Sequence, residues 1–306
     1  MKTIKSYREL PNEAKACVVA LGNFDGVHKG HRKIIEETIK IAKDKKTKSA
    51  VMTFEPHPAA ILRPDNKNFR LTDLKMKEKL ISEIGADFLF TIPFTEDFSK
   101  ITAEDFIKTI LIDSLQVKHV VIGHDFIFGH NRTGNPDFMQ KKSAELSFGI
   151  TIISAIKDEN EICSSTSVRE ALRQGDLKRV NKILGRNYSI DGLVIKGDAR
   201  GRQIGFPTAN INLGDLIRPA FGVYAVKIRL EDKIYNAVAN IGIRPTFGKE
   251  SELLEVHIFN FDKNIYDSSV NIEFIDYIRT ETKFKNVDEL TKQILIDCKK
   301  AEEILR

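Results

Sequence analysis

Short apolar runs alternate with segments of helical periodicity through the first half of the chain, and this alternation limits the possible folds more than any other feature. The strand-like runs cover residues 17–21, 50–54, 88–92, 119–122 and 150–155. The helix-like segments between them cover residues 30–43, 73–84, 103–115 and 137–146. Strands that are separated by helices pair in parallel, with helices on both faces of the sheet. We therefore predict an α/β domain with a doubly wound parallel sheet, whose ligands bind beyond the carboxyl ends of the strands.

The second part of the chain has a different pattern. Runs of Val, Ile, Tyr and Phe are interrupted there by Gly, Asn and Asp, at residues 190–195, 208–211, 223–230, 234–241, 253–259 and 270–277. This spacing predicts an antiparallel sheet or small β-barrel, with a hairpin turn at 231–233. Apolar residues on one face of the last segment predict a terminal helix over 287–305.

Two short predicted helices separate these parts, at residues 167–174 and 176–184, and Gly185 is a plausible stop for the second. A length of 306 residues suits about two domains. We therefore predict one domain over residues 1–185 and another over residues 186–306.

Composition excludes several classes of protein. The chain is 42% hydrophobic and has 48 basic against 43 acidic side chains, which is typical of a folded protein rather than a disordered one. Its longest apolar stretches, such as the one around residues 88–94, are less than half of the roughly 20 residues that a membrane helix needs. The N-terminal residues lack the apolar core of a secretion signal, so we expect a cytoplasmic protein without a membrane partner.

Cysteine and charge patterns narrow the choice further. Cys17, Cys163 and Cys298 are far apart and odd in number, so we expect reduced thiols rather than disulfides or a metal site. The net charge of +5 is small, and the lysines are scattered along helix-like segments, as on a solvated face. These charges give little support to a nucleic-acid partner and are compatible with small anionic substrates, and no feature of the sequence predicts an oligomeric state.

The segment GNFDGVHKGH, residues 22–31, follows the first predicted strand and leads into the first predicted helix. His28 and His31 are three residues apart, so both can reach one ligand from the first helical turn. Helix N-termini expose unpaired N–H groups, and the glycines of this segment let a polyphosphate approach the backbone closely. The pattern predicts an anion site, with the histidines as preorganised donors to a phosphate under attack.

Other interpretations of His28 and His31 remain open at this point. They are also compatible with exposed loop positions or with metal ligands. Zinc is disfavoured, because the sequence has neither an HExxH arrangement nor cysteines beside them.

HxGH after a first strand is the mark of the nucleotidyltransferase superfamily, which has a Rossmann-like sheet. The longer string resembles the N-terminal domain of the bacterial bifunctional riboflavin kinase/FAD synthetases, and further segments match that family in order. These are TFEPHP at 53–58, VIGHDFIFGHNRTG at 121–134 and SSTSVREALRQGD at 164–176.

This resemblance implies roles for individual residues. It implies that His28 and His31 are catalytic and that His57 and Asp125 line the flavin side of the site. The residues that it assigns to ATP in this domain are Gly22, Phe24, Asp25, Gly30, Ser165, Thr166 and Arg169.

Local physics suits part of that assignment. Thr166 has the position of a helix N-cap, with Arg169 on the first turn. Ser-Ser-Thr before a helix is, however, equally typical of simple capping. Lys29 and Ser167 depart from the family pattern, in which leucine and a basic residue are frequent.

A second glycine-rich segment, KGDARGRQIGFPTAN at residues 196–210, opens the β-rich part. It is neither a Walker A loop nor a GxGxxG motif, so a dinucleotide fold is excluded. Its glycines can form a flap whose N–H groups cradle phosphate, or they can simply form hairpin turns.

The string PTAN within it resembles the signature of riboflavin kinases, as do ANIGIRPTFG at 239–248 and LEVHIFNF at 254–261. The resemblance implies that Thr208 and Asn210 hold Mg²⁺ with ATP and that Glu255 is the catalytic base. The other residues that it assigns to ATP are Gly197, Gly201, Arg202 and Gly205. From its own strand alone, Glu255 is more typical of an outward-facing residue.

The stretch IRTETKF at residues 278–284 resembles a family segment near the flavin, with Thr280 in place of the usual proline. Arg279 is therefore a candidate flavin contact. The alternative is a surface salt bridge between Arg279 and Glu281.

Together these resemblances imply a bifunctional transferase. It would phosphorylate riboflavin to FMN with ATP in the C-terminal domain and adenylylate FMN to FAD, releasing pyrophosphate, in the N-terminal domain. Both reactions would use a divalent cation, most simply Mg²⁺. The first rival hypothesis is another adenylyltransferase, or a remnant with a single activity in which one half serves only to bind. The second is a flavin-sensing or RNA-associated regulator that kept the folds without the chemistry.

Overall fold

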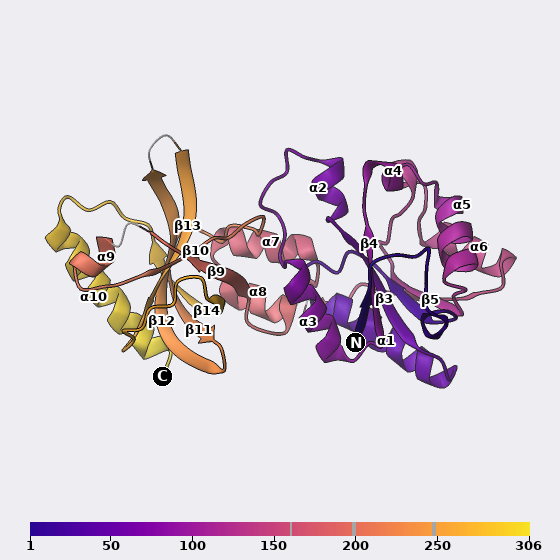
Figure 1. Ribbon diagram of the computed structural model, residues 1–306, viewed down its shortest axis with the longest axis horizontal. Helices are drawn as coiled ribbons and strands as arrows, with labels where there is room; N and C mark the ends of the chain where they lie inside the picture. Colours follow the sequence, from indigo (N-terminus) through magenta and orange to yellow (C-terminus); the bar gives the residue numbers. More distant parts are fainter. Residues whose placement is uncertain (160, 198–199, 247–248) are drawn as a thin grey trace. The chain divides into compact units, whose positions relative to one another are not determined.

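The computed structural model describes residues 1–159, 161–197, 200–246 and 249–306. The chain forms two compact units (Figure 1). One consists of Met1–Lys67 and Leu74–Ser164, and the other of Asn68–Asp73 and Ser165–Arg306. All predicted site residues lie within the described ranges, although the segments 196–210 and 239–248 each contain two residues outside them.

A six-stranded parallel sheet forms the centre of the first unit, in the order β1-β4-β3-β2-β5-β6. Its strands are β1 (Lys2–Ile4), β2 (Val18–Leu21), β3 (Ser49–Glu55), β4 (Phe88–Pro93), β5 (His119–Gly123) and β6 (Gly149–Ile153). The five predicted strands are confirmed, whereas β1 has only three residues and too little pattern to be predicted. From β2 the chain first builds β3 and β4 on one side and later β5 and β6 on the other, so the winding reverses beside β2.

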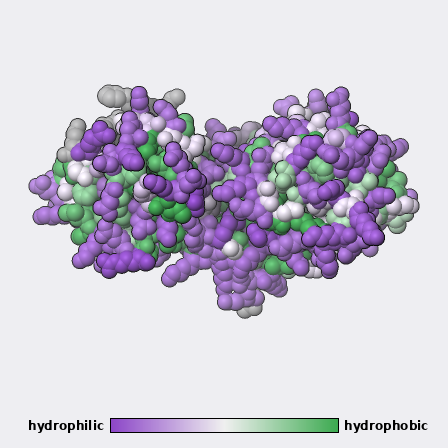
Figure 2. All heavy atoms as spheres, turned by 60° about the horizontal axis from the view of Figure 1, so that its bottom comes forward, coloured by the Kyte–Doolittle hydropathy of each residue, from purple (hydrophilic) through white to green (hydrophobic). Residues whose placement is uncertain are grey.

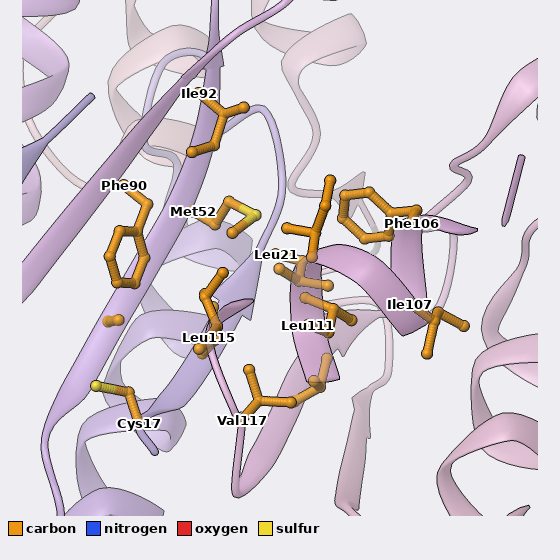
Figure 3. Close-up of a cluster of buried hydrophobic side chains, with 14 of the residues drawn as sticks. Cys17, Leu21, Met52, Phe90, Ile92, Phe106, Ile107, Leu111, Leu115 and Val117 are labelled. Carbon is orange, nitrogen blue, oxygen red and sulfur yellow. The ribbon is translucent and has the colours of Figure 1, made fainter. Parts of the chain in front are cut away.

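Helices cover both faces of this sheet, as predicted for a doubly wound fold. Side chains of α1 (Lys29–Asp44) and α3 (Leu74–Ile84) pack against Val18 and Ala20 on one face. On the other face, Leu21, Met52 and Phe90 of three neighbouring strands pack with side chains of the 103–115 region (Figure 3). The alternating directions of strand side chains therefore give each face its own apolar core.

The helix predicted over 103–115 differs in type from a single α-helix. It consists of a short α5 (Ala103–Asp105) and a π-helix (Phe106–Ser114). The buried residues Phe106, Ile107, Ile110 and Leu111 occur in pairs that suit either kind of turn, so the pattern predicts a helix but not its type.

Shorter elements complete the first unit. The predicted helix near 137–146 is α6 (Pro136–Glu145). The remaining elements, which were not predicted, are two short α-helices, two 3₁₀ turns and one hairpin: α2 (Pro58–Leu62), α4 (Glu96–Ser99), η1 (Asn12–Ala14), η3 (His130–Arg132), β7 (Lys157–Asp158) and β8 (Glu161–Ile162).

The second unit contains the predicted antiparallel barrel, closed in the order β10-β13-β12-β11-β14-β9. Its strands are β9 (Ser189–Ile195), β10 (Ala209–Ile211), β11 (Gly222–Leu230), β12 (Lys233–Thr246), β13 (Lys249–Ile258) and β14 (Ser269–Thr280). Leu230 pairs with Lys233, which confirms the predicted hairpin turn. The terminal helix α10 (Val287–Ile304) packs Ala301 against barrel residues such as Val223 and Ala225.

Two further helices belong to the second unit, α7 (Ser165–Gln174) and α8 (Leu177–Leu184). Gly185 ends α8 in the left-handed conformation at φ 72°, as the sequence indicates. By compactness the units divide at Ser165, whereas a division of activities at residue 186 remains a prediction.

The surface is largely polar where Figure 2 shows it, with hydrophilic side chains interrupting the apolar areas. Among the described residues, no helix combines the length and the apolar character needed to cross a bilayer.

Candidate active sites

The first candidate site lies at the carboxyl ends of three adjacent strands, β3, β2 and β5. The segment that contains His28 follows β2, the segment that contains His57 follows β3, and Asp125 follows β5. Because carboxyl ends of parallel strands share one edge of a sheet, the fold brings these segments to a common edge. This edge lies beside the reversal of winding, where ligands of such sheets bind.

His28 is the N-cap of α1. Its Nδ1 accepts a hydrogen bond from the His31 backbone N–H at 3.3 Å, and the side chain is only 6% exposed. Since Nδ1 acts as an acceptor, the neutral ring carries its proton on Nε2. His28 therefore presents a donor without a net charge, and the alternative of an exposed loop position is wrong for this residue.

The two histidine rings form a stacked pair. Their centroids are 3.6 Å apart in a stacked arrangement, and the Phe24 ring meets His31 edge-on at 5.2 Å. Among the residues that the structure describes, no group of three or more His, Cys, Asp or Glu side chains could hold a metal ion. The ring N–H donors of the pair and the N-terminus of α1 are groups that can bind a phosphate.

Gly22 and Gly30 leave room for these rings. A Cβ at Gly22 would lie 3.1 Å from the Phe24 ring, and one at Gly30 would lie 3.0 Å from the His28 ring. The backbone between them is strained, because Phe24 and the β-branched Val27 have positive φ values of 48° and 41°. Such conformations cost roughly 1–3 kcal/mol each and are concentrated at functional sites.

The predicted flavin residues of this unit differ in their surroundings. His57 is 7% exposed and caps α2, its Nδ1 accepting from the Ala59 N–H at 3.1 Å. The Asp125 side chain is 79% exposed, with His124 Nδ1 at 3.9 Å. The cap hydrogen bond thus fixes the orientation of the His57 ring, with Nε2 on the side opposite the cap. The exposed Asp125 carboxylate is accessible to a ligand.

The residues of the other predicted ATP motif lie on α7 in the second unit. The prediction that Thr166 is the N-cap is wrong, because α7 begins at Ser165 and Thr166 lies inside its first turn. Arg169 donates from Nε to the Phe69 carbonyl at 2.7 Å, and its guanidinium stands 5.7 Å from the centre of the Phe69 ring. Arg169 is therefore held in place beside the segment that precedes α3.

The second candidate site is a row of polar residues across three adjacent barrel strands. Asn210 on β10 is directly opposite Glu255 on β13, which in turn is opposite Asn240 on β12. Directly opposed residues project from the same face of a sheet. Leu254 and Val256, on either side of Glu255, are fully buried, so Glu255 alternates with the apolar core as its strand predicts.

The glycine-rich segment packs closely on this row. A Cβ at Gly197 would lie 2.2 Å from Asn210 Nδ2, and one at Gly201 would lie 2.2 Å from the Phe206 carbonyl oxygen and 3.5 Å from Thr208 Oγ1. Gly201 belongs to a short helix, α9 (Arg200–Gln203), and Gly205 has φ +87°. Because Gly197 and Gly201 have no side chain, the backbone can lie close to Asn210 and Phe206, and Gly205 allows a left-handed turn. A flap that binds phosphate needs both features.

A cavity of about 410 Å³ opens beside the flap. Arg202 and Thr208 line it, together with the segment 261–266, which includes Lys263. Asn210 and Glu255 are not among its lining residues. The cavity can accept an anionic ligand, since a guanidinium and an ammonium line it against the single carboxylate of Asp262.

Asn210 is well suited to a hard cation. It is 4% exposed, and its Oδ1 is buried without a hydrogen-bond partner among the described residues. Buried acceptors are normally satisfied, and an amide oxygen is an ordinary Mg²⁺ ligand. The donor set of Asn210 and Thr208 therefore fits the predicted magnesium site.

Arg279, the predicted flavin contact of the barrel, is engaged elsewhere. Its guanidinium binds Asp297 of α10 in a bidentate manner, with N···O distances of 2.7–3.0 Å, and Asp297 is 3% exposed. The alternative of a surface pair between Arg279 and Glu281 is wrong, because the partner is this buried carboxylate. Arg279 thus fastens the terminal helix to the barrel.

Sequence reasoning missed two buried charged residues, Lys77 and Asp297. A signal was present for Lys77, because it lies at helical spacing from Ile81 and beside Met76 on the apolar face of α3. A lysine on an apolar face is uncommon enough to examine. Asp297 had no comparable signal within its own helix.

Together, the fold and the two sites define a class of protein. It is the class of two-domain enzymes that transfer phosphoryl groups in one domain and nucleotidyl groups in the other. A family model described as FAD synthetase matches residues 10–167, and one described as riboflavin kinase matches residues 184–305.

Relatives match over nearly the whole length. The bifunctional riboflavin kinase/FMN adenylyltransferase of Bacillus subtilis is 39% identical over 98% of this chain and 97% of its own, and that of Escherichia coli K12 is 37% identical over 99% and 97%. A crystal structure described as a macrolide-efflux protein from Streptococcus pneumoniae superposes with a TM-score of 0.87 at 32% identity, covering 99% of both chains. The chain belongs to the family of bifunctional riboflavin kinase/FMN adenylyltransferases.

Proposed function

We propose that this chain makes FAD from riboflavin in two ATP-dependent steps, with one active site in each half. The observation that carries the proposal is the presence of two separate clusters of polar groups whose chemistry suits a phosphate ligand. One is the His28-capped N-terminus of α1, and the other is the Asn210–Glu255 row under the glycine flap. The two family models, which match successive parts of the chain, support the same order of activities.

In the first step, Glu255 accepts the proton of the terminal ribityl hydroxyl of riboflavin as that oxygen attacks the γ-phosphorus of ATP. The bond to the β-phosphate oxygen breaks, and FMN and ADP leave. The place of Glu255 on a strand between two asparagine-bearing strands supports this role. Backbone N–H groups of the flap, with Arg202 and Thr208, bind the transferring phosphates.

In the second step, a phosphate oxygen of FMN attacks the α-phosphorus of ATP. The bond to the bridging oxygen of the β-phosphate breaks, and FAD and pyrophosphate form. The His28 Nε2–H and His31 donate to the α-phosphate as its charge increases, and no covalent enzyme intermediate is needed. The N-terminus of α1 binds phosphate oxygens, while His57 and Asp125 face the flavin.

Mg²⁺ is the metal that we assign to these reactions. When bound, it neutralises phosphate charge and orients the transferring group. Thr208 and Asn210 would hold it in the kinase site, which the unpartnered Oδ1 of Asn210 supports. Ser165, Thr166 and Arg169 would contact ATP in the adenylyltransferase site, and Arg279 would lie near the flavin of the kinase site.

The boundary between the two activities is proposed at residue 186, close to the start of the riboflavin kinase match at 184.

The partners are small molecules, namely riboflavin, FMN and ATP, and the compartment is the cytoplasm. Burial raises the pKa of the Cys17 thiol to about 12, so it remains protonated and unreactive.

Two substitutions test the division of labour. His31→Ala should lower FAD formation from FMN by about 100-fold or more while FMN formation from riboflavin continues, because it removes one phosphate donor. Glu255→Ala should lower FMN formation by roughly 10²- to 10⁴-fold and leave adenylylation of supplied FMN intact. Both rates are measured by chromatography on each purified variant. Loss of both activities in a folded variant would contradict separate sites.

A further inference from the structure

A lysine lies fully buried under the first candidate site. Lys77, on α3, is 0% exposed and has apolar neighbours on its own helix, Met76, Leu80 and Ile81. Removing an ammonium group from water is unfavourable unless hydrogen bonds compensate for the lost hydration. Methionine or leucine would fill this position without that penalty, so packing alone gives no reason for a lysine.

The Lys77 ammonium reaches the loop that carries the histidines. Its Nζ donates to the Asn23 carbonyl oxygen at 2.8 Å and lies 3.3 Å from Thr53 Oγ1. The Thr53 hydroxyl donates to the same Asn23 carbonyl at 3.0 Å. Thr53 lies near the carboxyl end of β3 and is itself fully buried. Helix α3, strand β3 and the loop after β2 are thus joined at one carbonyl oxygen.

The backbone that follows this carbonyl is the strained part of the loop. Phe24, Gly26 and Val27 have φ values of 48°, 82° and 41°, and His28 comes next. Positive φ at non-glycine residues persists only where the surroundings hold it. The hydrogen bonds to Asn23 O act at the start of this stretch, and the cap between His28 Nδ1 and His31 N acts at its end.

We propose that Lys77 is a positioning residue for the adenylyl transfer. Its ammonium holds the Asn23 carbonyl, and so keeps the strained loop in the conformation that stacks His28 on His31. Its buried charge also adds to the positive field at the N-terminus of α1, where a polyphosphate would bind. This inference rests on the proposed adenylyltransferase function of the first unit.

The test compares Lys77→Met with Lys79→Met, which makes the same change at an exposed position of the same helix. Lys77→Met should lower kcat for FAD formation from FMN roughly 10- to 100-fold, because misplacement of the donors weakens contacts made in the transition state. Its melting temperature should stay within a few degrees of wild type, since an apolar side chain of similar volume replaces a buried charge. FMN formation by the same variant, and both activities of Lys79→Met, should be unchanged.

Several outcomes would overturn the inference. A purely structural lysine predicts the opposite pattern, a lower melting temperature with kcat preserved. If Lys77→Met does not fold, Thr53→Val is used as the test instead. This variant keeps the Lys77 ammonium but removes the second hydrogen-bond donor to the Asn23 carbonyl. That variant should lose about 3- to 10-fold in kcat for FAD formation, a smaller misplacement, and an unchanged kcat would contradict the inference. Absence of FAD formation by the wild-type chain would instead contradict the proposed function.

Discussion

At the scale of single residues, His28 has two functions in the first site that can be separated. His28 caps α1 through Nδ1 and presents Nε2–H to the ligand, so one ring both begins the helix and supplies a donor. The His31 ring stacks on it at 3.6 Å. Substitutions can separate the cap from the donor.

We predict that His28→Asn and His28→Ala both lower FAD formation by about 100-fold or more, because both lack the ring donor. Only His28→Ala should lose the cap, which is worth about 1 kcal/mol. Its melting temperature should therefore fall by roughly 2–4 °C more than that of His28→Asn. Scanning calorimetry of the two variants measures this difference, and equal melting temperatures would show that the cap contributes nothing.

The flap allows a second prediction at this scale. Gly197→Ala would place a Cβ 2.2 Å from Asn210 Nδ2, so the flap or the asparagine must move. We expect FMN formation to fall at least about tenfold, as small displacements near transferring groups usually cause. Adenylylation of supplied FMN is the internal control and should be unchanged. A Gly197→Ala variant with normal kinase activity would separate Gly197 from the nucleotide site.

Site residues could be predicted from sequence only where a local pattern carries them. His28, Gly201 and Asn210 lie in dense motifs, and the structure gives each a close neighbour that suits the expected role. The errors concern one partner on a distant element and the exact start of one helix. Arg279 binds Asp297, which is 18 positions away on another element, and α7 begins at Ser165, two residues before the predicted start at 167, so that Thr166 lies inside it.

At the scale of elements, the register of the sheet depends on polar contacts at strand ends as well as on its apolar cores. Asp87, just before β4, accepts hydrogen bonds from the Ser49 N–H at 2.9 Å and the Ser49 hydroxyl at 2.8 Å, at the start of β3. Burial alone would raise the pKa of Asp87, but these bonds and the Lys48 ammonium outweigh burial and lower it. The carboxylate is therefore favoured in the folded state.

This shift predicts a pH-dependent contribution to stability. A carboxyl whose pKa is lower in the folded state stabilises the fold above its unfolded pKa of about 3.9, and that contribution is lost as pH falls through the folded pKa. Asp87→Asn should cost about 1 kcal/mol at pH 7, the usual worth of such hydrogen bonds, since the partly exposed pair with Lys48 adds little.

Calorimetry of Asp87→Asn at pH 7 and near pH 3 checks the sign. The difference from wild type should shrink at the lower pH, and Asp97→Asn, at a side chain that is 94% exposed, should show none at either. A difference that grows on acidification would contradict the assigned direction of the pKa shift.

Element type was predictable where the periodicity was long and regular. All six barrel strands and α1 follow from alternation or helical spacing. The short elements β1, β7, β8 and α2 show neither a clear alternation nor a helical spacing in the sequence, so they were not predicted. The barrel closes because β9 pairs with β10. This pairing cannot be predicted from the sequence of either strand alone.

At the scale of the whole molecule, the chain divides into two units that do not follow the sequence continuously. Asn68–Asp73 belongs with the barrel unit although both of its flanking segments belong to the other. Ile217 N donates to Arg70 O at 2.8 Å, and Arg218 pairs with Glu252, which also accepts from Asn68. Local patterns along the sequence do not contain such pairing between distant segments, so they predict two domains but not these compact units.

The central claim is that one chain carries both reactions of FAD synthesis. In the most direct measurement, the purified chain is incubated with riboflavin, ATP and Mg²⁺, and the amounts of the flavins and of pyrophosphate are followed by chromatography. The account predicts that riboflavin is consumed, that FMN appears first, and that FAD and pyrophosphate then accumulate in equal amounts. If neither riboflavin nor separately supplied FMN is consumed, the account is contradicted.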